Sequence, residues 1–586
     1  MTDKIRPSKV MLTFGPGSIV DLPDNESVMV MGVDFWNSIS RIVEPRLAKK
    51  KGVDFFGSPE NWLIDDKWPA GLPVRDFPYF RVCPSCSKLW HVSKLKYNLY
   101  CPRCQGKKTI PVRLVAACRN GHIQDFPWAT WCNCKCDPSS ADLYLEGRTG
   151  SVESDLMIVC RRCGAHRGLT GALDILETPC EGERPWMGDK EDCGEKLKGL
   201  LRGASNVYFA DIDSSFSIPP FSKKIYRLIS NHYSTAKRNW ETHTIRDYIQ
   251  ANQDVKDIME KCEFTVDEME QAFNNMYDAK VSNLKIDEWN TLIKGTTSDP
   301  TSDFRSEKIE IPSDSPLRAW FNSVCVLDKI REVTTLTGFS RIWPYEKGSS
   351  TRIQTIRFNQ NELDAFKKDN KSVSPAPQSD TELKWFPGIE LFGEGIFLEF
   401  KPERVAAWEK DPEVIRRCKS IVSVGASLKR LPREREGIDF SLPRTILIHT
   451  FAHLLIKRIS LSCGYSQASM RERVYSCDTD SGRSLSGVVI YTVSPDSEGS
   501  LGGLVAQAAK HKTLENHIDA LMENIQICSQ DPLCASHDCT TTGNPWGASC
   551  HSCCQLSETS CEGLQNKLLD RWTLMGGNAV KGFFAD

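Results

Sequence analysis

Strand-like patterns of apolar residues occur in three places along the chain. A Gly-Pro-Gly turn at residues 15–17 leads into the apolar run Ile19–Leu22. No Lys-Ser or Lys-Thr pair follows the glycines, so this pattern predicts a turn that begins a strand, not a phosphate-binding loop. Val488–Val493 is apolar apart from Thr492, which predicts a buried strand. Apolar residues at even spacings between glycines predict a β-hairpin over Ile389–Phe400.

Helical spacing of apolar residues marks the middle and the C-terminal part of the chain. Ser234–Ile293 is rich in charged and amide side chains with apolar residues at helical intervals, which predicts a helical region. Pro443 begins an apolar stretch as the first residue of a helix often does, and Leu514–Ile527 predicts another helix. Polar segments at 296–306 and 367–381 are typical of linkers.

Composition and charge indicate a folded protein without a general attraction to nucleic acid. Hydrophobic residues make up 40% and charged residues 26% of the sequence, which is ordinary for globular proteins. The formal net charge is -2, so any nucleic-acid binding must use local basic patches. We expect a cytoplasmic protein, because residues 1–15 lack the apolar core of a signal peptide and the apolar stretch Ile446–Ile456 is too short to span a bilayer.

Cysteine is the most informative residue type, because the 24 cysteines fall largely into tight clusters near the two ends of the chain. Pairs with two intervening residues in a cytosolic protein favour zinc over disulfides. Two such pairs at a spacing that closes one tetrahedron give the clearest site, formed by Cys83, Cys86, Cys101 and Cys104. A closed site of four thiolates stabilises a fold and leaves no position for water.

Two further groups of possible ligands follow in the N-terminal part. We expect a second zinc site from the pair Cys160 and Cys163 with the single cysteines Cys180 and Cys193. A third group lies around two tryptophans and contains more ligands than one site needs, so it is only a possible site: Cys118, His122, Cys132, Cys134 and Cys136.

A zinc site is also expected near the C-terminus. Cys550, Cys553 and Cys561 supply three ligands close together in sequence, and Cys528 or Cys534 supplies the fourth. Spacing does not decide between these last two cysteines.

Together the patterns predict an α+β, multidomain protein with about three to five domains in its 586 residues. It would have N-terminal zinc-ribbon-like modules, a helical middle region and a C-terminal α/β zinc-binding domain. The expected divisions are an N-terminal segment at 1–80, a cysteine-rich module at 81–200, a mainly helical region at 201–330, a mixed region at 331–440 with its linker near 367–381, and the zinc-binding domain at 441–586.

No catalytic centre is evident in the sequence. His449 and His453 lie one helical turn apart, as in zinc proteases, but Thr450 stands where those enzymes carry the general-base glutamate. We therefore favour a packing role for both histidines over a metal site. No Gly-Lys-Ser or Gly-Lys-Thr sequence occurs, which argues against a P-loop NTPase. We expect a protein that is not an enzyme; a zinc hydrolase using the two histidines is the less favoured alternative.

Local basic patches could contact phosphates. Each is more often an ordinary solvated surface, yet several together could neutralise a nucleic-acid backbone. The candidate residues are Lys223, Lys224, Arg227, Arg416, Arg417 and Lys419.

Residues 441–586 resemble the zinc-binding domain at the C-terminus of MrfA-type helicases. In that family four cysteines hold zinc, which implies the same role for Cys550, Cys553 and Cys561 with Cys528 or Cys534. The resemblance is carried by His449–Ile456, Gly464–Ser466, Glu472–Tyr475, Gly502–Leu504 and the cysteines Cys550, Cys553 and Cys561.

The rest of the chain resembles the DrmB subunits of the DISARM anti-phage defence system, although residues of about 230–310 match no family pattern. The matching segments are Thr13–Leu22, Cys118–Trp128, Arg202–Phe209 and Ser217–Pro220. This resemblance implies a non-catalytic subunit that pairs with a DrmA-like helicase and helps the complex to bind and move along phage DNA. The alternative from the residues alone is a zinc scaffold that binds RNA or proteins without a helicase.

Overall fold

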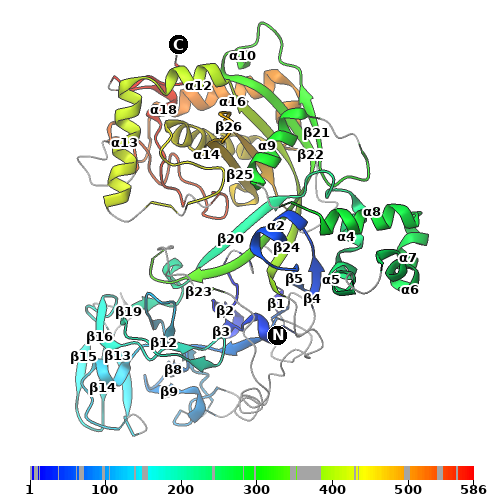
Figure 1. The fold of residues 1–586 in the computed structure, drawn as a ribbon. Coiled ribbons are helices and arrows are strands. Elements are labelled where there is room, and N and C mark those ends of the chain that lie inside the picture. Colours follow the sequence, from blue (N-terminus) through cyan, green and yellow to red (C-terminus); the bar gives the residue numbers. More distant parts are fainter. Residues whose placement is uncertain are drawn as a thin grey trace. The chain divides into compact units, whose positions relative to one another are not determined.

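The structure is a computed structural model with helices and strands in both halves of the chain (Figure 1). It describes residues 3–4, 11, 13–36, 39–60, 63–64, 72–95, 99–104, 106–137, 140–147, 156–239, 244–280, 283–295, 299–343, 351–352, 384–427, 431–432, 434–493, 502–537, 546–562, 565–577 and 579–585. The linker expected near 367–381 lies outside these residues. The mixed α+β class with N-terminal cysteine clusters is confirmed.

The chain divides into two compact units, each made of three separate segments. Unit 1 consists of residues 1–41, 56–213 and 335–389. Unit 2 consists of residues 42–55, 214–334 and 390–586. The chain therefore passes between the units five times along its length.

Unit 1 contains small antiparallel sheets that carry the N-terminal cysteines. One sheet has the order β10-β8-β9, another β12-β11-β19-β16, a third β13-β14-β15 and a fourth β2-β3-β7. The bounds are β2 Ile19–Leu22, β3 Glu26–Val30, β7 Val74–Asp76, β8 Phe80–Val82, β9 Leu89–His91, β10 Ile110–Pro111, β11 Leu114–Ala117, β12 Ile123–Asp125, α3 Trp128–Trp131, β13 Leu143–Gly147, β14 Leu156–Cys160, β15 His166–Gly168, β16 Ile175–Pro179, β17 Glu183–Arg184, β18 Asp189–Lys190 and β19 Lys196–Leu201.

Arg341 organises several loops of unit 1. Its buried guanidinium donates hydrogen bonds to the carbonyl oxygens of Gly17, Gly121 and Val207 at 2.7, 2.8 and 2.6 Å. The Gly-Pro-Gly turn before β2 is thereby fixed as a structural turn, as its sequence predicts. Gly17 has a φ of +86°, and a Cβ there would lie 2.8 Å from the ring of Phe339. Glycine is required at this position for both reasons.

The largest sheet follows the path β20-β22-β24-β26-β25, and its strands β25 and β26 lie wholly in unit 2. The bounds are β20 Phe209–Phe216, β21 Arg305–Ile309, β22 Phe321–Ser340, β24 Trp385–Phe400, β25 Met470–Asp478 and β26 Ser484–Thr492, with the shorter strands β4 Ile39–Ile42, β5 Phe55–Pro59 and β23 Thr351–Arg352 joined to it. The buried strand expected at Val488–Val493 is present as β26.

The hairpin expected over Ile389–Phe400 is wrong, because these residues belong to the single long strand β24. Its glycines do not form a turn. A Cβ on Gly393 would lie 1.8 Å from the carbonyl oxygen of Thr492, and one on Gly395 would lie 3.0 Å from that of Ile490. The glycines therefore allow close approach to β26, which sequence spacing alone does not distinguish from a turn.

The helical middle region is confirmed. It consists of α4 Lys224–Leu228, α5 Ser230–Asn239, α6 Ile245–Ala251, α7 Gln253–Cys262, α8 Val266–Tyr277 and α9 Leu284–Lys294. Capping boxes begin α6 at Thr244 and α8 at Thr265. The last helix is joined to the sheet by a buried ion pair, in which Arg473 donates to both carboxylate oxygens of Glu288 at 2.7 and 2.8 Å.

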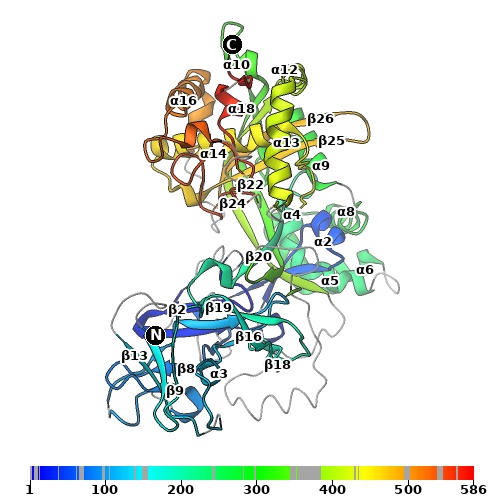
Figure 2. The same cartoon turned by 90° about the vertical axis from the view of Figure 1, so that its left-hand side faces the viewer.

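The core of the C-terminal part is built around α14 Pro443–Cys463. This helix packs against β25 and β26 and against the helices α13 and α16 (Figures 1 and 2). Pro443 occupies its first turn, and Gly464 ends it in the left-handed conformation. The neighbouring helices are α12 Pro402–Trp408, α13 Pro412–Ser427, α15 Ala506–Ala509, α16 His511–Asn524 and α18 Trp572–Met575, with α2 Pro45–Lys51 and α10 Leu317–Trp320 elsewhere in the chain.

Among the described residues, α14 is the one helix long and apolar enough to cross a membrane. The helix extends beyond the apolar stretch Ile446–Ile456 on both sides, to 21 residues. However, 72% of its most apolar window is buried inside the fold. This burial is what a helix at the centre of a protein core requires.

Candidate metal centres

Four sets of side chains in the described residues bring four sulfur or nitrogen ligand atoms within 4.8 Å of one another. Tetrahedral zinc with Zn–S bonds of about 2.3 Å separates its sulfur atoms by about 3.8 Å. The Sγ–Sγ distances that characterise these sets are between 3.5 and 3.9 Å. Each set therefore has the dimensions of a closed tetrahedral zinc site.

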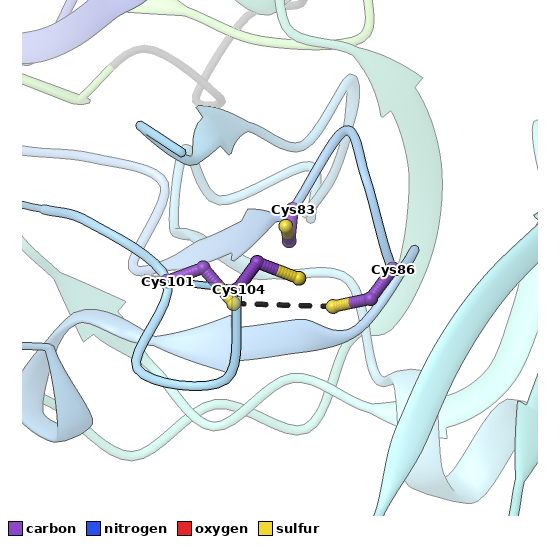
Figure 3. A group of neighbouring side chains, drawn as sticks. All are labelled: Cys83, Cys86, Cys101 and Cys104. Carbon is purple, nitrogen blue, oxygen red and sulfur yellow. Dashed lines mark hydrogen bonds between the residues drawn. The ribbon is translucent and has the colours of Figure 1, made fainter. Parts of the chain in front are cut away.

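The first set is the one expected from sequence, formed by Cys83, Cys86, Cys101 and Cys104. Figure 3 shows the four side chains converging from two tight turns. In the first turn, the amide of Ser87 donates to the carbonyl oxygen of Cys83 at 2.9 Å. Burial raises the pKa of Cys101, but backbone amides of Cys104 and Arg103 outweigh it and lower that pKa to about 7. This thiol therefore ionises readily, as a zinc ligand must.

The second set differs from the expected grouping. Cys180 and Cys193 lie with Cys118 and His122, not with Cys160 and Cys163. The Nδ1 atom of His122 lies 3.4 Å from Cys118 Sγ, and its Nε2 atom lies 2.6 Å from a carboxylate oxygen of Glu191.

A carboxylate behind a histidine fixes the ring and its tautomer in metal sites, so His122 is held with Nδ1 free to bind. The pKa of Cys118 is lowered to about 4 by its hydrogen bonds with Cys180 and His122.

The third set joins Cys160 and Cys163 to Cys134 and Cys136. Backbone amides of Ala165 and Lys135 lower the pKa of Cys163 to about 6. Cys132, which the sequence also offered as a ligand, is excluded from the set. It is buried and its Sγ lies 3.5 Å from the carbonyl oxygen of Ala129.

The fourth set lies in the C-terminal part and uses both of the cysteines between which spacing could not decide. It consists of Cys528, Cys534, Cys550 and Cys553. Cys561 is not part of it, so the expected triplet with Cys550 and Cys553 is wrong. Spacing misleads here because the segment after α16 places Cys528 beside Cys550 and Cys534 beside Cys553.

Basic groups surround the fourth set. Arg571 Nη2 lies 3.4 Å from Cys534 Sγ, and Lys457 donates to the carbonyl oxygen of Ser552 at 2.6 Å. Four thiolates and one zinc ion carry a net negative charge, which these cations offset. Hydrogen bonding with Cys534 and Cys554 holds the pKa of Cys553 far below that of a free thiol.

Cys561 instead lies with His449, His453 and Glu472 in a buried group. The expectation that the two histidines only pack in the helix did not include Glu472, which sequence reasoning missed. It was named only within Glu472–Tyr475, one of the segments that resemble MrfA-type domains, and no role was predicted for it.

The basic residues proposed for phosphate contact divide into exposed and buried ones. Lys223 and Lys224 are exposed at the start of α4, and Arg416 and Lys419 are exposed on α13. Arg227 lies 3.5 Å from Asp303.

Arg417 is contradicted as a phosphate contact because it is buried. It donates to both carboxylate oxygens of Asp570 at 2.9 and 3.2 Å and stacks over Trp572. A side chain used in this way cannot reach a nucleic-acid backbone.

Matches to two protein families cover all four sets. Residues 6–209, which include three of the four sets, match a domain of unknown function, DUF8724. Residues 451–554 match the MrfA Zn-binding domain and include the whole fourth set. Zinc is therefore the cofactor of this protein.

Two known proteins are similar to the chain to different degrees. The crystal structure of the DUF1998 helicase MrfA bound to DNA matches at 10% identity and a TM-score of 0.19, over 39% of this chain and 22% of that one, which is too slight to support an argument. DISARM protein DrmB of Bacillus paralicheniformis is 29% identical over 94% of this chain and 97% of its own length. The chain is thus a relative of DISARM protein DrmB over nearly its whole length, with an MrfA Zn-binding domain in its C-terminal part.

Proposed function

We propose that this protein is a non-catalytic, zinc-stabilised subunit of a DISARM-type anti-phage system, and that it supports DNA binding and translocation by a DrmA-like helicase. The observation that carries the proposal is the similarity to DrmB along nearly the entire chain, which includes both the N-terminal and the C-terminal zinc regions. A similarity confined to one zinc module would not favour one system over another.

The four sets would each hold one zinc ion in a structural role. Their ligands are Cys83, Cys86, Cys101 and Cys104; Cys118, His122, Cys180 and Cys193; Cys134, Cys136, Cys160 and Cys163; and Cys528, Cys534, Cys550 and Cys553. Every set supplies four protein ligands, so none keeps the open position at which catalytic zinc activates water. This supports a role as a scaffold and disfavours a zinc hydrolase at these centres.

Exposed lysine and arginine side chains would supply the contacts to DNA. Lys223 and Lys224 lie together at the start of α4, and Arg416 and Lys419 lie one helical turn apart on α13. Arg416 forms a surface ion pair with Glu413 at 2.6 Å. Such a pair contributes little to stability, so the arginine can bind a phosphate in place of the glutamate. Because the net charge is -2, we expect binding by this subunit alone to be weak and strongly dependent on salt.

The test is co-purification with a DrmA-like helicase, followed by salt titrations of DNA binding with and without it. The salt slope is the steepness with which the logarithm of the binding constant falls with the logarithm of the salt concentration. Each lost phosphate contact should reduce this slope by about 0.7 to 0.9. The variants are Lys223→Ala/Lys224→Ala and Arg416→Ala/Lys419→Ala. Lys196→Ala/Lys512→Ala removes two exposed lysines elsewhere and serves as the charge-matched control.

We expect the helicase to co-purify, and at least one patch variant to lower the affinity and slope of the complex while the control does not. Absence of the helicase from the purified material, with RNA or another protein in its place, would favour a helicase-independent scaffold. ATP or peptide hydrolysis that survives repurification and is lost on a point mutation in this chain would contradict the non-catalytic role.

A further inference from the structure

A fully buried group of four potential ligands lies beside the fourth cysteine set. His449 and His453 are one turn apart on α14, Glu472 lies on β25, and Cys561 belongs to the segment that follows the cysteine set. The two imidazoles are 0% exposed, Glu472 is 1% exposed and Cys561 is 7% exposed. Polar side chains so deeply buried need partners that satisfy every ionised or lone-pair atom.

Backbone carbonyl groups fix the orientation of both imidazole rings. The Nδ1 atom of His449 lies 3.3 Å from the carbonyl oxygen of Leu568, and that of His453 lies 3.0 Å from the carbonyl oxygen of Cys554. A carbonyl can only accept, so both Nδ1 atoms carry a proton, and each ring in its neutral form has its lone pair on Nε2. Histidines that bind metals through Nε2 are held in this way.

The inward-facing atoms have the spacing of a coordination shell. Glu472 Oε1 lies 3.3 Å from His449 Nε2 and 3.5 Å from His453 Nε2. Cys561 Sγ lies 3.4 Å from His449 Nε2. Zinc bonds of about 2.0 to 2.3 Å in a tetrahedron separate such atoms by about 3.3 to 3.6 Å.

Without a cation these atoms would oppose one another. Lone pairs of two imidazoles and a carboxylate face the same point, and His453 Nε2 and Glu472 Oε2 make no hydrogen bond within the described residues. A divalent ion with one carboxylate, one thiolate and two neutral imidazoles forms a unit with no net charge. Such a unit is compatible with the hydrophobic core around α14, whereas an isolated buried charge is not.

We propose that His449, His453, Glu472 and Cys561 hold a fifth zinc ion, distinct from the four-cysteine centre. With four protein ligands the site is closed and its role is structural. It joins the central helix, strand β25 and the segment around Cys561. The residue after Cys553 carries the carbonyl oxygen that accepts from His453, so the two zinc centres of this region are coupled through one stretch of backbone.

Zinc content of the purified full chain tests the site. Cys561→Ser and Glu472→Gln should each contain one zinc ion fewer than the wild type. Cys418→Ser is the matched control, because Cys418 is a buried thiol of the same core outside every set, and its zinc content should equal that of the wild type. Equal zinc content in the wild type, Cys561→Ser and Glu472→Gln would overturn the proposal and favour a buried imidazolium–carboxylate pair.

Cadmium NMR of the cadmium-substituted wild type keeps the proposal testable if the variants do not fold. The number of thiolates around the metal sets the chemical shift, so a one-thiolate site resonates apart from three- and four-thiolate sites. We expect one resonance in the one-thiolate region in addition to those of the other centres. A spectrum that shows only three- and four-thiolate sites in a fully metal-loaded chain would also overturn the proposal.

Discussion

At the scale of single residues, Arg341 shows how one buried side chain can replace regular secondary structure. It satisfies three carbonyl oxygens from segments far apart in sequence, and burial lowers its pKa to about 9. Burying an arginine costs desolvation free energy, so its N–H donors need acceptors within the protein. The loops around β2, β12 and β20 therefore depend on it for their backbone hydrogen bonds.

We predict that Arg341→Met destabilises the protein by about 3 kcal/mol or more, because three buried carbonyl oxygens would lose their donors. The measurement is the midpoint of denaturant-induced unfolding, followed by tryptophan fluorescence. Arg416→Met, at an exposed position, should change stability by no more than about 0.5 kcal/mol. Equal midpoints for the two variants would show that the Arg341 hydrogen bonds contribute no net stability.

Asp125 gives a pH-dependent prediction at the same scale. Burial raises its pKa to about 7, although the amide of Phe80, 3.2 Å from its carboxylate, opposes the shift. Because the folded pKa lies above the unfolded value, this group favours folding at low pH, and its contribution is lost as the pH rises from about 4 to about 7.

Asp125→Asn removes this dependence while its side-chain oxygen can still accept from Phe80. We expect the stability of the variant relative to the wild type to increase by about 1 kcal/mol between pH 6 and pH 8. Thermal melts of both proteins at the two pH values provide the measurement, and zinc release affects both equally. A relative stability that stays constant or falls over this range would mean that Asp125 does not titrate there.

At the scale of elements, the third cysteine set allows a direct comparison of neighbouring thiols. Cys134 belongs to the set, whereas Cys132, two residues earlier, does not. We predict that Cys134→Ser lowers the zinc content by one ion per chain and the melting temperature by several degrees. Cys132→Ser should retain all of the zinc, and loss of zinc from both variants would contradict the grouping.

What sequence could predict at this scale depended on whether ligands are local. The pairs Cys83/Cys86 and Cys101/Cys104 were assigned to one site correctly as neighbours in space, since each pair is fixed by its own turn. The single cysteines were misgrouped because strands β11, β14 and β19 decide which loops meet. The same limit applied to His449 and His453 on α14, because the other two side chains of their group come from strand β25 and from a segment distant in sequence.

Burial was the other quantity that sequence could not supply. The basic run at 416–419 suggested a solvated face, but the helical arrangement turns Arg417 into the core while its neighbours remain exposed. In contrast, α8 was predictable from its capping box and helical periodicity, and α14 from Pro443 followed by an apolar stretch, because these signals are contained in consecutive residues.

At the scale of the whole molecule, zinc ligands occur in both units, so metal removal should affect both. We predict that a strong chelator makes unit 1 and unit 2 sensitive to protease, because closed zinc sites contribute folding free energy. Mass spectrometry of the early fragments provides the measurement, with excess zinc added beside the chelator as the control. Fragments confined to one unit would show that the other folds without its metal.

The interleaving of the two units has a consequence for how such proteins can evolve. Each unit is encoded by three separated stretches, and the chain changes unit after residues 41, 55, 213, 334 and 389. A single recombination event between two related genes can exchange only one continuous stretch up to a breakpoint. It would therefore give a hybrid in at least one unit, whose core would combine residues selected in different ancestors. Inheritance of the two units as one block is expected, in contrast to proteins whose domains follow one another along the gene and can be shuffled separately.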